Sequence, residues 1–261
     1  MRRIRMILEY DGTNYVGWQT QPNGTAVQAI LEKALCAVTG ENVTLHASGR
    51  TDSGVHALAQ VAHFDTAARM PADKFAYALN ALLPRDIRVL CSEEAPADFH
   101  ARFSAKRKHY RYTLLHSAHG RVFLRDTALH VHGALDEPAM QAAAQSVLGE
   151  HDFLAFMAAG STLTDTTRTV CRSEWTRAGS LLYYDIEGNG FLYNMVRILV
   201  GTMLAVGKGT LAPESIALAL ASRARKDAGP TAPAHGLTLM RVVYPDFDTE
   251  TVLASLRGEN E

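Results

Sequence analysis

The order of strand-like and helix-like segments constrains the fold of this chain most strongly. In the first hundred residues, apolar side chains either alternate with polar ones, as in strands, or recur every three to four positions, as in helices. Thr25 and Gln28 have the spacing of a capping box at the start of the first helix, and Gly40 is a typical helix stop. The order is the β-α-β-β-α-β of a ferredoxin-like unit, built from Arg3–Tyr10, a helix over about 25–40, Asn42–Ser48, Ala59–Asp65, Pro71–Leu82 and Ile87–Cys91.

The second half of the chain repeats this order loosely. Its expected segments are a strand at Lys108–His116, a helix at Glu137–Leu148, a hairpin of Val170–Arg177 with Leu181–Glu187, helices at Tyr193–Val206 and Pro213–Arg223, and a strand at Leu237–Tyr244. We therefore predict an α+β fold of two ferredoxin-like halves that face each other across a cleft. The expected parts are residues 1–105, residues 106–246 and a polar, peripheral tail over 247–261.

The composition excludes several classes of protein. An apolar content of 47% and a charged content of 20% are typical of a soluble globular chain. The net charge of −1 gives no sign of a polyanion partner, so any nucleic-acid surface must be local. We expect no secretion signal and no membrane span, because the longest apolar stretch, Met195–Val206, is too short and contains Arg197. Three widely spaced cysteines fit a reduced, cytoplasmic protein without disulfides or a zinc site.

The segment Gly49–Ala57, with the sequence GRTDSGVHA, is the first candidate for chemistry. Its carboxylate, Asp52, lies between two glycines and between two strand-like segments. Glycines permit a tight turn and a close approach of a ligand to the backbone. The ordinary interpretation is a turn, because Asp, Ser and Gly are common turn formers. The alternative is a carboxylate presented for catalysis.

Aromatic side chains lie near basic ones in two further segments. The polar loop over residues 11–23 contains Tyr15 and Trp18, which can either stack on bases or pack back onto the core. The stretch from Phe99 to Arg125 contains seven Lys or Arg residues and no carboxylate, with Tyr110 among its aromatic residues. Charges that neutralise phosphates, interleaved with rings that stack on bases, favour RNA over a solvated strand face.

Arg197 is the single charged residue between Phe191 and Val206. A guanidinium among apolar residues is costly unless an anion meets it or the side chain reaches solvent. Asp52 is an attractive anion for it, because the Arg fork can bind a carboxylate with two hydrogen bonds. Such a pair would keep Asp52 ionised.

These segments resemble the tRNA pseudouridine synthase A family. GRTDSGVHA differs from that family's GRTDAGVHA signature at Ser53 alone. Similar segments occur in the family's order at YDGTNYVGWQTQPN, HARFSAKRKHYRY, GNGFLYNMVR and APAHGLTLMRVVY, which together span nearly the whole chain. The resemblance implies the pseudouridine synthase fold, with a basic cleft between its halves.

The resemblance also implies roles for individual residues. Asp52 would be the catalytic nucleophile, and Arg197 its partner. Tyr110 would pack its ring on the target uracil, and Leu237 would form part of the apolar floor beneath it. Arg50, Lys106 and Lys108 would contact the RNA, while Thr51 and His56 would support the nucleophile.

The function implied by the family is the isomerisation of uridine to pseudouridine at positions 38, 39 and 40 of the tRNA anticodon stem-loop. The reaction breaks the N1–C1′ bond, rotates the uracil and joins C5 to C1′, so it needs no cofactor. Members of the family act as homodimers, which implies the same here. Two other functions remain open from the residues: a non-catalytic RNA-binding protein or tRNA chaperone, and an RNA hydrolase that uses Asp52.

Overall fold

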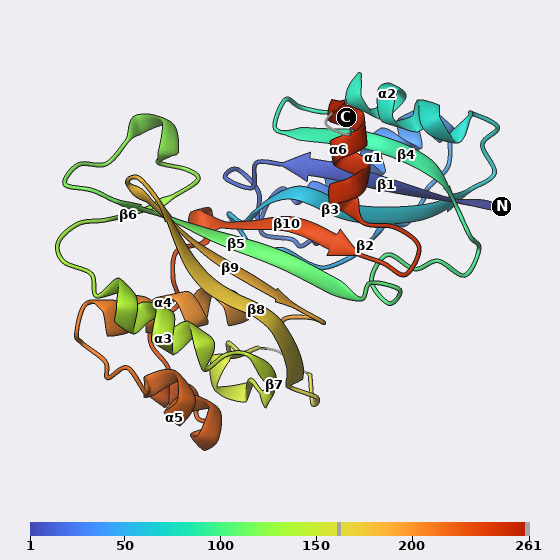
Figure 1. The fold of residues 1–261 in the computed structure, drawn as a ribbon. Coiled ribbons are helices and arrows are strands. Elements are labelled where there is room, and N and C mark those ends of the chain that lie inside the picture. The colour runs from blue at the N-terminus through green and yellow to red at the C-terminus, as the bar shows by residue number, and fades with distance from the viewer. Residues whose placement is uncertain (161–162, 259–261) are drawn as a thin grey trace. The chain divides into compact units, whose positions relative to one another are not determined.

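The computed structural model describes residues 1–160 and 163–258 and divides the chain into two compact units (Figure 1). Unit 1 comprises Met1–Lys106 and Thr238–Glu261, and unit 2 comprises Arg107–Leu237. We expected residues 238–246 in the C-terminal half and 247–261 in a separate tail. Both segments belong to unit 1 instead, because the last strand of the chain pairs with a strand of the first half.

The sheet of unit 1 is centred on β1 (Arg2–Tyr10), which lies between β3 (His56–Thr66) and β4 (Ile87–Ala95) and is antiparallel to both. Two further strands pair with the edge of β3 that faces away from β1. The short β2 (His46–Ala47) pairs with it in antiparallel fashion, and β10 (Leu237–Val243) pairs with it in parallel at His56 and Ala57. The chain order and sheet order of β1 to β4 confirm the ferredoxin-like prediction for the first half.

The core of unit 1 lies between one face of this sheet and its helices α1 (Val27–Thr39) and α2 (Phe75–Asn80). One face of β1 is buried as the period-2 pattern predicts, since its alternate side chains Ile4, Met6 and Leu8 are fully buried. The predicted capping box is wrong. Ala26 is the N-cap of α1, and Gln28 Nε2 donates to Glu32 Oε1 instead, at 2.9 Å.

Two other predicted elements of unit 1 are shorter than expected. Of the strand over 42–48 only β2 forms, because Glu32 Oε1 on α1 accepts a hydrogen bond from the Leu45 backbone N–H at 2.9 Å. The helix over 71–82 becomes a 3₁₀ turn, Ala72–Lys74, followed by α2. It ends early because the Asn80 side chain bonds both backbone groups of Val89 on β4, at 2.8 and 2.9 Å.

The C-terminal segment is not a peripheral tail. It forms α6 (Thr249–Arg257), which Asp248 caps by accepting from the Glu250 N–H at 3.0 Å. Thr249 is fully buried and its hydroxyl accepts from the Val242 N–H at 3.0 Å. Arg241 of β10 also binds Asp248, so side chains fasten the segment to unit 1.

The sheet of unit 2 has the order β5 (Arg107–His116), β9 (Leu181–Gly188), β8 (Thr167–Ala178), β7 (Gly149–Asp152). A short β6 (Leu129–Val131) pairs with β5 in parallel, and Gly179 turns the β8–β9 hairpin with φ 61°. Its helices are α3 (Glu137–Gln145), α4 (Met195–Gly207) and α5 (Ser215–Ser222).

In unit 2, α3 lies against both β8 and α4, and the Trp175 indole of β8 reaches the Met203 sulfur of α4 at 3.2 Å. The chain order β5-α3-β8-β9-α4-β10 repeats β-α-β-β-α-β, with β6, β7 and α5 added. The predicted α+β class and repeated element order are therefore confirmed. Across residues 1–160 and 163–258, no helix has both the length and the apolar content to cross a membrane.

Candidate active site

Asp52 lies at the first position of a tight turn in unit 1. The Val55 N–H donates to the Asp52 carbonyl oxygen at 3.1 Å, and Gly54 has a φ of 77°, which a residue with a Cβ adopts only under strain. The side chain of Asp52 is half-buried and that of the adjacent Arg50 is exposed. One short piece of backbone therefore carries both a carboxylate and a guanidinium.

A buried network of uncharged groups holds the start of this turn. The Thr51 hydroxyl bonds the Tyr10 hydroxyl at 2.8 Å, and Gln60 Nε2 donates to the Gly49 carbonyl oxygen at 2.9 Å. The Ser48 hydroxyl donates to Gln60 Oε1 at 2.6 Å. Burial raises the pKa of Tyr10 to about 12, so its hydroxyl stays neutral. Thr51 thus supports the turn, as the sequence led us to expect.

The loop over residues 11–23 packs directly against the Asp52 turn. The Trp18 N–H donates to the Thr51 carbonyl oxygen at 3.1 Å, and the Gly54 N–H donates to the Tyr15 carbonyl oxygen at 3.3 Å. A Cβ on Gly12 would lie 2.1 Å from the Val55 carbonyl oxygen, and one on Gly17 would lie 2.6 Å from that of Thr51. Glycine is therefore required at both positions for this close approach.

The two aromatic residues of this loop pack onto unit 1. Trp18 is 2% exposed and Tyr15 is 7% exposed, and the Tyr15 hydroxyl donates to Asp86 at 2.6 Å. Of the two interpretations left open by the sequence, packing on the core is the one observed. His56 is buried below the loop, where its Nδ1 accepts from the Gly12 N–H at 3.0 Å.

In unit 2, Tyr110 and Tyr112 lie on the same face of β5, as predicted from their spacing. Tyr112 is fully buried, and its hydroxyl donates to the Pro233 carbonyl oxygen at 2.8 Å. Burial raises its pKa well above the usual value. The Tyr110 ring meets Phe191 edge-on, with 5.3 Å between the centroids. The neighbouring Lys108 side chain is half-buried.

The opposite face of β5 carries a charge network that the sequence did not reveal. Asp185 on β9, which is buried, accepts from His109 Nε2 at 2.6 Å and from Arg111 Nε and Nη2 at 2.9 Å each. Despite its burial, these partners lower the pKa of Asp185 to about 2. Arg107 of β5 forms an ion pair with Glu187, which also lies on β9, at 3.0 Å. Arg107 and Arg111 are thus met by acids from β9, although their own segment has none.

Arg197 lies in the first turn of α4, among apolar residues, and its side chain is half-buried. Its Nε donates to the Ala232 carbonyl oxygen and its Nη1 donates to Asn194 Oδ1, both at 2.8 Å. Two fixed acceptors define the plane of the guanidinium. Tyr112 lies close enough for Arg197 to influence its pKa.

Sequence reasoning missed Asn194. It precedes α4 with a left-handed φ of 60°, a conformation that Asn tolerates better than most residues. The available signal was an Asn three residues before an isolated Arg. Leu237, the first residue of β10, is 5% exposed. The candidate residues are thus divided: Arg50, Asp52 and Lys106 belong to unit 1, whereas Lys108, Tyr110, Arg197 and Leu237 belong to unit 2.

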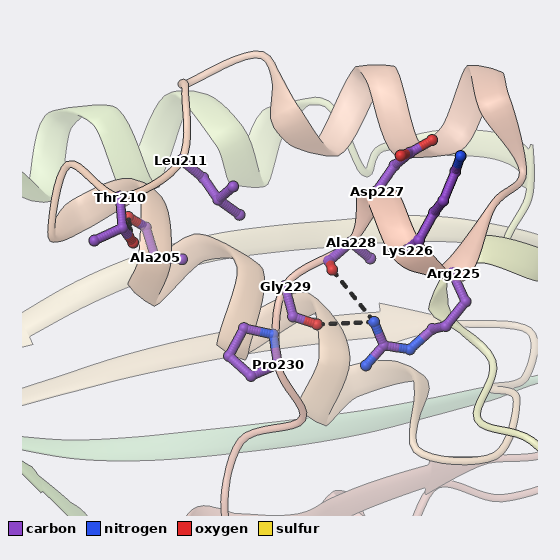
Figure 2. A pocket seen from close by; sticks show the side chains of 9 residues that line it. All are labelled: Ala205, Thr210, Leu211, Arg225, Lys226, Asp227, Ala228, Gly229 and Pro230. Carbon is purple, nitrogen blue, oxygen red and sulfur yellow. Dashed lines mark hydrogen bonds between the residues drawn. The ribbon is translucent and has the colours of Figure 1, made fainter.

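A separate open pocket of about 730 Å³ lies in unit 2 at the C-terminal end of α4 (Figure 2). Arg225 Nη1 there donates to the Ala228 and Gly229 carbonyl oxygens at 3.3 and 2.9 Å, so this guanidinium serves the backbone. The pocket includes Ala205, eight residues beyond Arg197 along the helix, which corresponds to roughly 12 Å. None of the candidate site residues lines it.

Known proteins match nearly the entire chain. A family model described as tRNA pseudouridine synthase matches residues 6–104 and 143–245. The tRNA pseudouridine synthase A of Ruminiclostridium cellulolyticum is 48% identical over 245 residues, which are 94% of this chain and 100% of that protein. That of Halalkalibacterium halodurans is 50% identical over 238 residues, 91% of this chain and 90% of that protein. The chain belongs to the tRNA pseudouridine synthase family.

Proposed function

We propose that this chain uses the carboxylate of Asp52 to isomerise uridines 38, 39 and 40 in the anticodon stem-loop of tRNA. As a member of its family, the chain is an isomerase that converts uridine to pseudouridine in tRNA. The observation that best supports Asp52 is its turn: a half-buried carboxylate on a backbone that Tyr10, Gln60 and the glycine loop hold rigidly. A rigid support is what a nucleophile needs for a defined angle of attack.

The proposed reaction conserves every atom of the substrate. The N1–C1′ bond breaks, the uracil rotates, C5 bonds to C1′, and the proton on C5 is lost while N1 gains one. Asp52 can attack C1′ or C6, or remove the C2′ proton, and all three routes require it to be ionised. We assign to Arg197 the task of keeping it so, because its guanidinium plane is held by Asn194 and Ala232.

The remaining residues would bind the RNA. The target nucleotide must leave its stack, which costs a few kcal/mol, and the Tyr110 ring, backed edge-on by Phe191, would cover the exposed uracil. Leu237 would contact the other side of the base. Arg50 is exposed beside Asp52 and would hold the backbone of the flipped nucleotide, while the exposed Lys106 and the half-buried Lys108 would hold neighbouring phosphates.

Asp52→Asn tests the nucleophile assignment, because it retains the shape of the side chain and removes its charge. We expect tritium release from tRNA labelled at uridine C5 to fall to background while tRNA affinity and unfolding temperature stay unchanged. The matched control is Ser53→Ala on the same turn, whose hydroxyl only donates to the Tyr15 carbonyl oxygen at 3.2 Å. It should keep activity within about twofold. Substantial turnover by Asp52→Asn would refute the assignment.

A second assay, which maps pseudouridine along the tRNA, separates the synthase from the alternative functions. Mapping pseudouridine with a base-specific adduct at single-nucleotide resolution would reveal which of positions 38, 39 and 40 react, and an intact strand would exclude hydrolysis.

We also propose a homodimer in the cytoplasm, where tRNA is modified. Light scattering of the purified protein, alone and with tRNA, tests the dimer.

A further inference from the structure

Unit 1 carries a cluster of rings, which we call the ring platform: the exposed His46 and Phe103, the half-buried His100 and the buried His63, with Arg102 beside them. The His46 and His63 rings stack with centroids 5.1 Å apart and planes 25° apart. His100 meets His63 at 4.7 Å and Phe103 at 4.4 Å. Phe103 is 76% exposed, and His46 and Arg102 are also exposed. The Phe103 and His46 side chains are therefore open to solvent, whereas His63 is buried.

The backbone beneath the platform is fixed by hydrogen bonds. The Ala101 N–H donates to His63 Nδ1 at 3.1 Å, and the Tyr244 hydroxyl donates to the Ala101 carbonyl oxygen at 2.7 Å. The His100 N–H donates to the Ser104 hydroxyl at 3.0 Å, and the Ser104 N–H donates back to the His100 carbonyl oxygen at 2.9 Å. A ring on such a turn loses little conformational freedom when it binds a partner.

The histidines of the platform are not a metal site. Across residues 1–160 and 163–258, no three His, Cys, Asp or Glu side chains are placed to hold a metal ion. Burial, helped by His100, Arg3 and His46, lowers the pKa of His63 to about 4, so its ring is neutral near pH 7. The nearby Asp65 is bound by Arg3 Nε and Nη2 at 2.8 and 2.7 Å. The platform therefore presents the exposed Phe103 ring beside the guanidinium of Arg102, whose carbon lies 5.8 Å from the Phe103 centroid.

Tyr77 on α2 provides the contrast. It is 72% exposed and has a cation above its ring, Lys74 at 5.2 Å. That cation, however, is paired with Asp73 at 2.9 Å. An isolated exposed ring is ordinary. Several joined ring faces beside a guanidinium form a surface that suits a nucleobase and its phosphate.

We propose that the ring platform is a binding surface for an unpaired nucleotide of the tRNA substrate. The base stacks on Phe103, and Arg102 contacts the adjacent phosphate. This inference rests on tRNA as the substrate but not on Asp52 as the nucleophile. It assigns to the segment His100–Ser104 a role in holding the RNA, separate from the chemistry.

Binding of an unmodified tRNA transcript to three variants tests the proposal. Phe103→Ala should weaken binding about tenfold, within the range for loss of one base–ring stack, and leave the salt dependence unchanged. Arg102→Gln should instead reduce the slope of log Kd against log salt by about one contact. Tyr77→Ala, the matched exposed ring, should bind like the unaltered protein. An unchanged Kd for Phe103→Ala overturns the proposal.

A direct readout of stacking comes from Phe103→Trp. We expect it to restore affinity and its exposed indole to be quenched when tRNA is added, whereas Tyr77→Trp is not quenched. Phe103→Ala should raise KM and retain kcat, the reverse of the effect expected for Asp52→Asn, so failure of either assignment is visible separately. If Phe103→Ala instead changes the mass measured by light scattering without changing tRNA affinity, the platform is a contact for a second copy of the chain, and the proposal is wrong.

Discussion

The Asp52 turn of unit 1 and strand β5 of unit 2 are held by opposite means. Hydrogen bonds between neutral groups hold the turn. They come from the Tyr10 and Thr51 hydroxyls, the Gln60 amide and the backbone of the loop over residues 11–23. On β5, a buried acid holds the strand, because Arg111 forms an ion pair with Asp185 and His109 forms a hydrogen bond with it. The candidate carboxylate thus stands on a neutral frame, whereas the basic strand has its own buried acid.

This difference has a chemical consequence. Hydrogen bonds between neutral groups fix the backbone from which the Asp52 side chain projects. The buried Asp185 of β9 holds β5 in place. The ion pairs with β9 also neutralise the charges of Arg107 and Arg111. We therefore expect contacts to RNA to come from basic residues outside the pairs with β9, such as Arg50 and Lys106.

Gly12→Ala should have the largest effect. Its Cβ would lie 2.1 Å from the Val55 carbonyl oxygen, so the loop must move away from the Asp52 turn. We expect a loss of about 4 kcal/mol of unfolding free energy by urea titration, together with most of the activity. Gly120→Ala is the matched control, because the nearest atom to its Cβ would be 3.6 Å away. Near-normal stability and activity of Gly12→Ala would show that the loop does not hold the turn.

Arg197→Lys addresses the cation of unit 2. Lysine retains the positive charge but cannot donate to Ala232 and Asn194 in the fixed plane of the guanidinium. We expect kcat to fall roughly 300-fold, equivalent to about 3.4 kcal/mol, while the unfolding free energy falls by about 1 kcal/mol or less. If stability falls as much as activity, Arg197 is a structural residue.

Many of the helices and strands could be predicted from the sequence, because the periodicity of apolar residues reports local structure. The alternation of Ile4, Met6 and Leu8 predicted β1, and the pattern over Lys108–His116 predicted β5. Contacts between distant segments could not be predicted. The bond from Glu32 to Leu45 removed most of an expected strand, and the pairing of β10 with β3 moved the last strand into unit 1.

The candidate site followed the same rule. Asp52 and Arg197 stay predictions, which rest on an unusual local setting: a carboxylate between two glycines and a guanidinium in an apolar helix. Asp185 was missed because its partners are 74 to 76 residues away in sequence, and only the register of β5 with β9 brings them together. Asn194 was missed because its importance lies in a backbone angle.

His63 makes unit 1 sensitive to mild acid. Its pKa is about 4 in the folded chain, against an ordinary value of 6.5, so the unfolded chain binds more protons between these values. Stability should therefore be complete above pH 6.5 and fall by about 3 kcal/mol as the pH drops to 4. Trp175→Phe leaves Trp18 as the reporter of unit 1 in urea titrations. His63→Asn should flatten this pH dependence, and the exposed His119→Asn should not. A parallel decline in the His63→Asn protein would contradict the assignment.

Asp185 should make unit 2 sensitive only to stronger acid, and with a smaller effect. Its pKa is about 2 in the folded chain, against an ordinary 3.8, because His109 and Arg111 favour the charged form. The ionised Asp185 stabilises the folded chain fully above pH 3.8. This stability is lost as the pH falls to 2, and the unfolding free energy then decreases by about 2 kcal/mol. Trp18→Phe leaves Trp175 on β8 as the reporter. Asp185→Asn should lower stability at pH 7, because His109 and Arg111 lose their anion, and flatten the curve between pH 4 and 2. If Trp18 and Trp175 instead report one acid transition at the same pH, His63 and Asp185 do not set separate acid limits for the two units, because the units then unfold together.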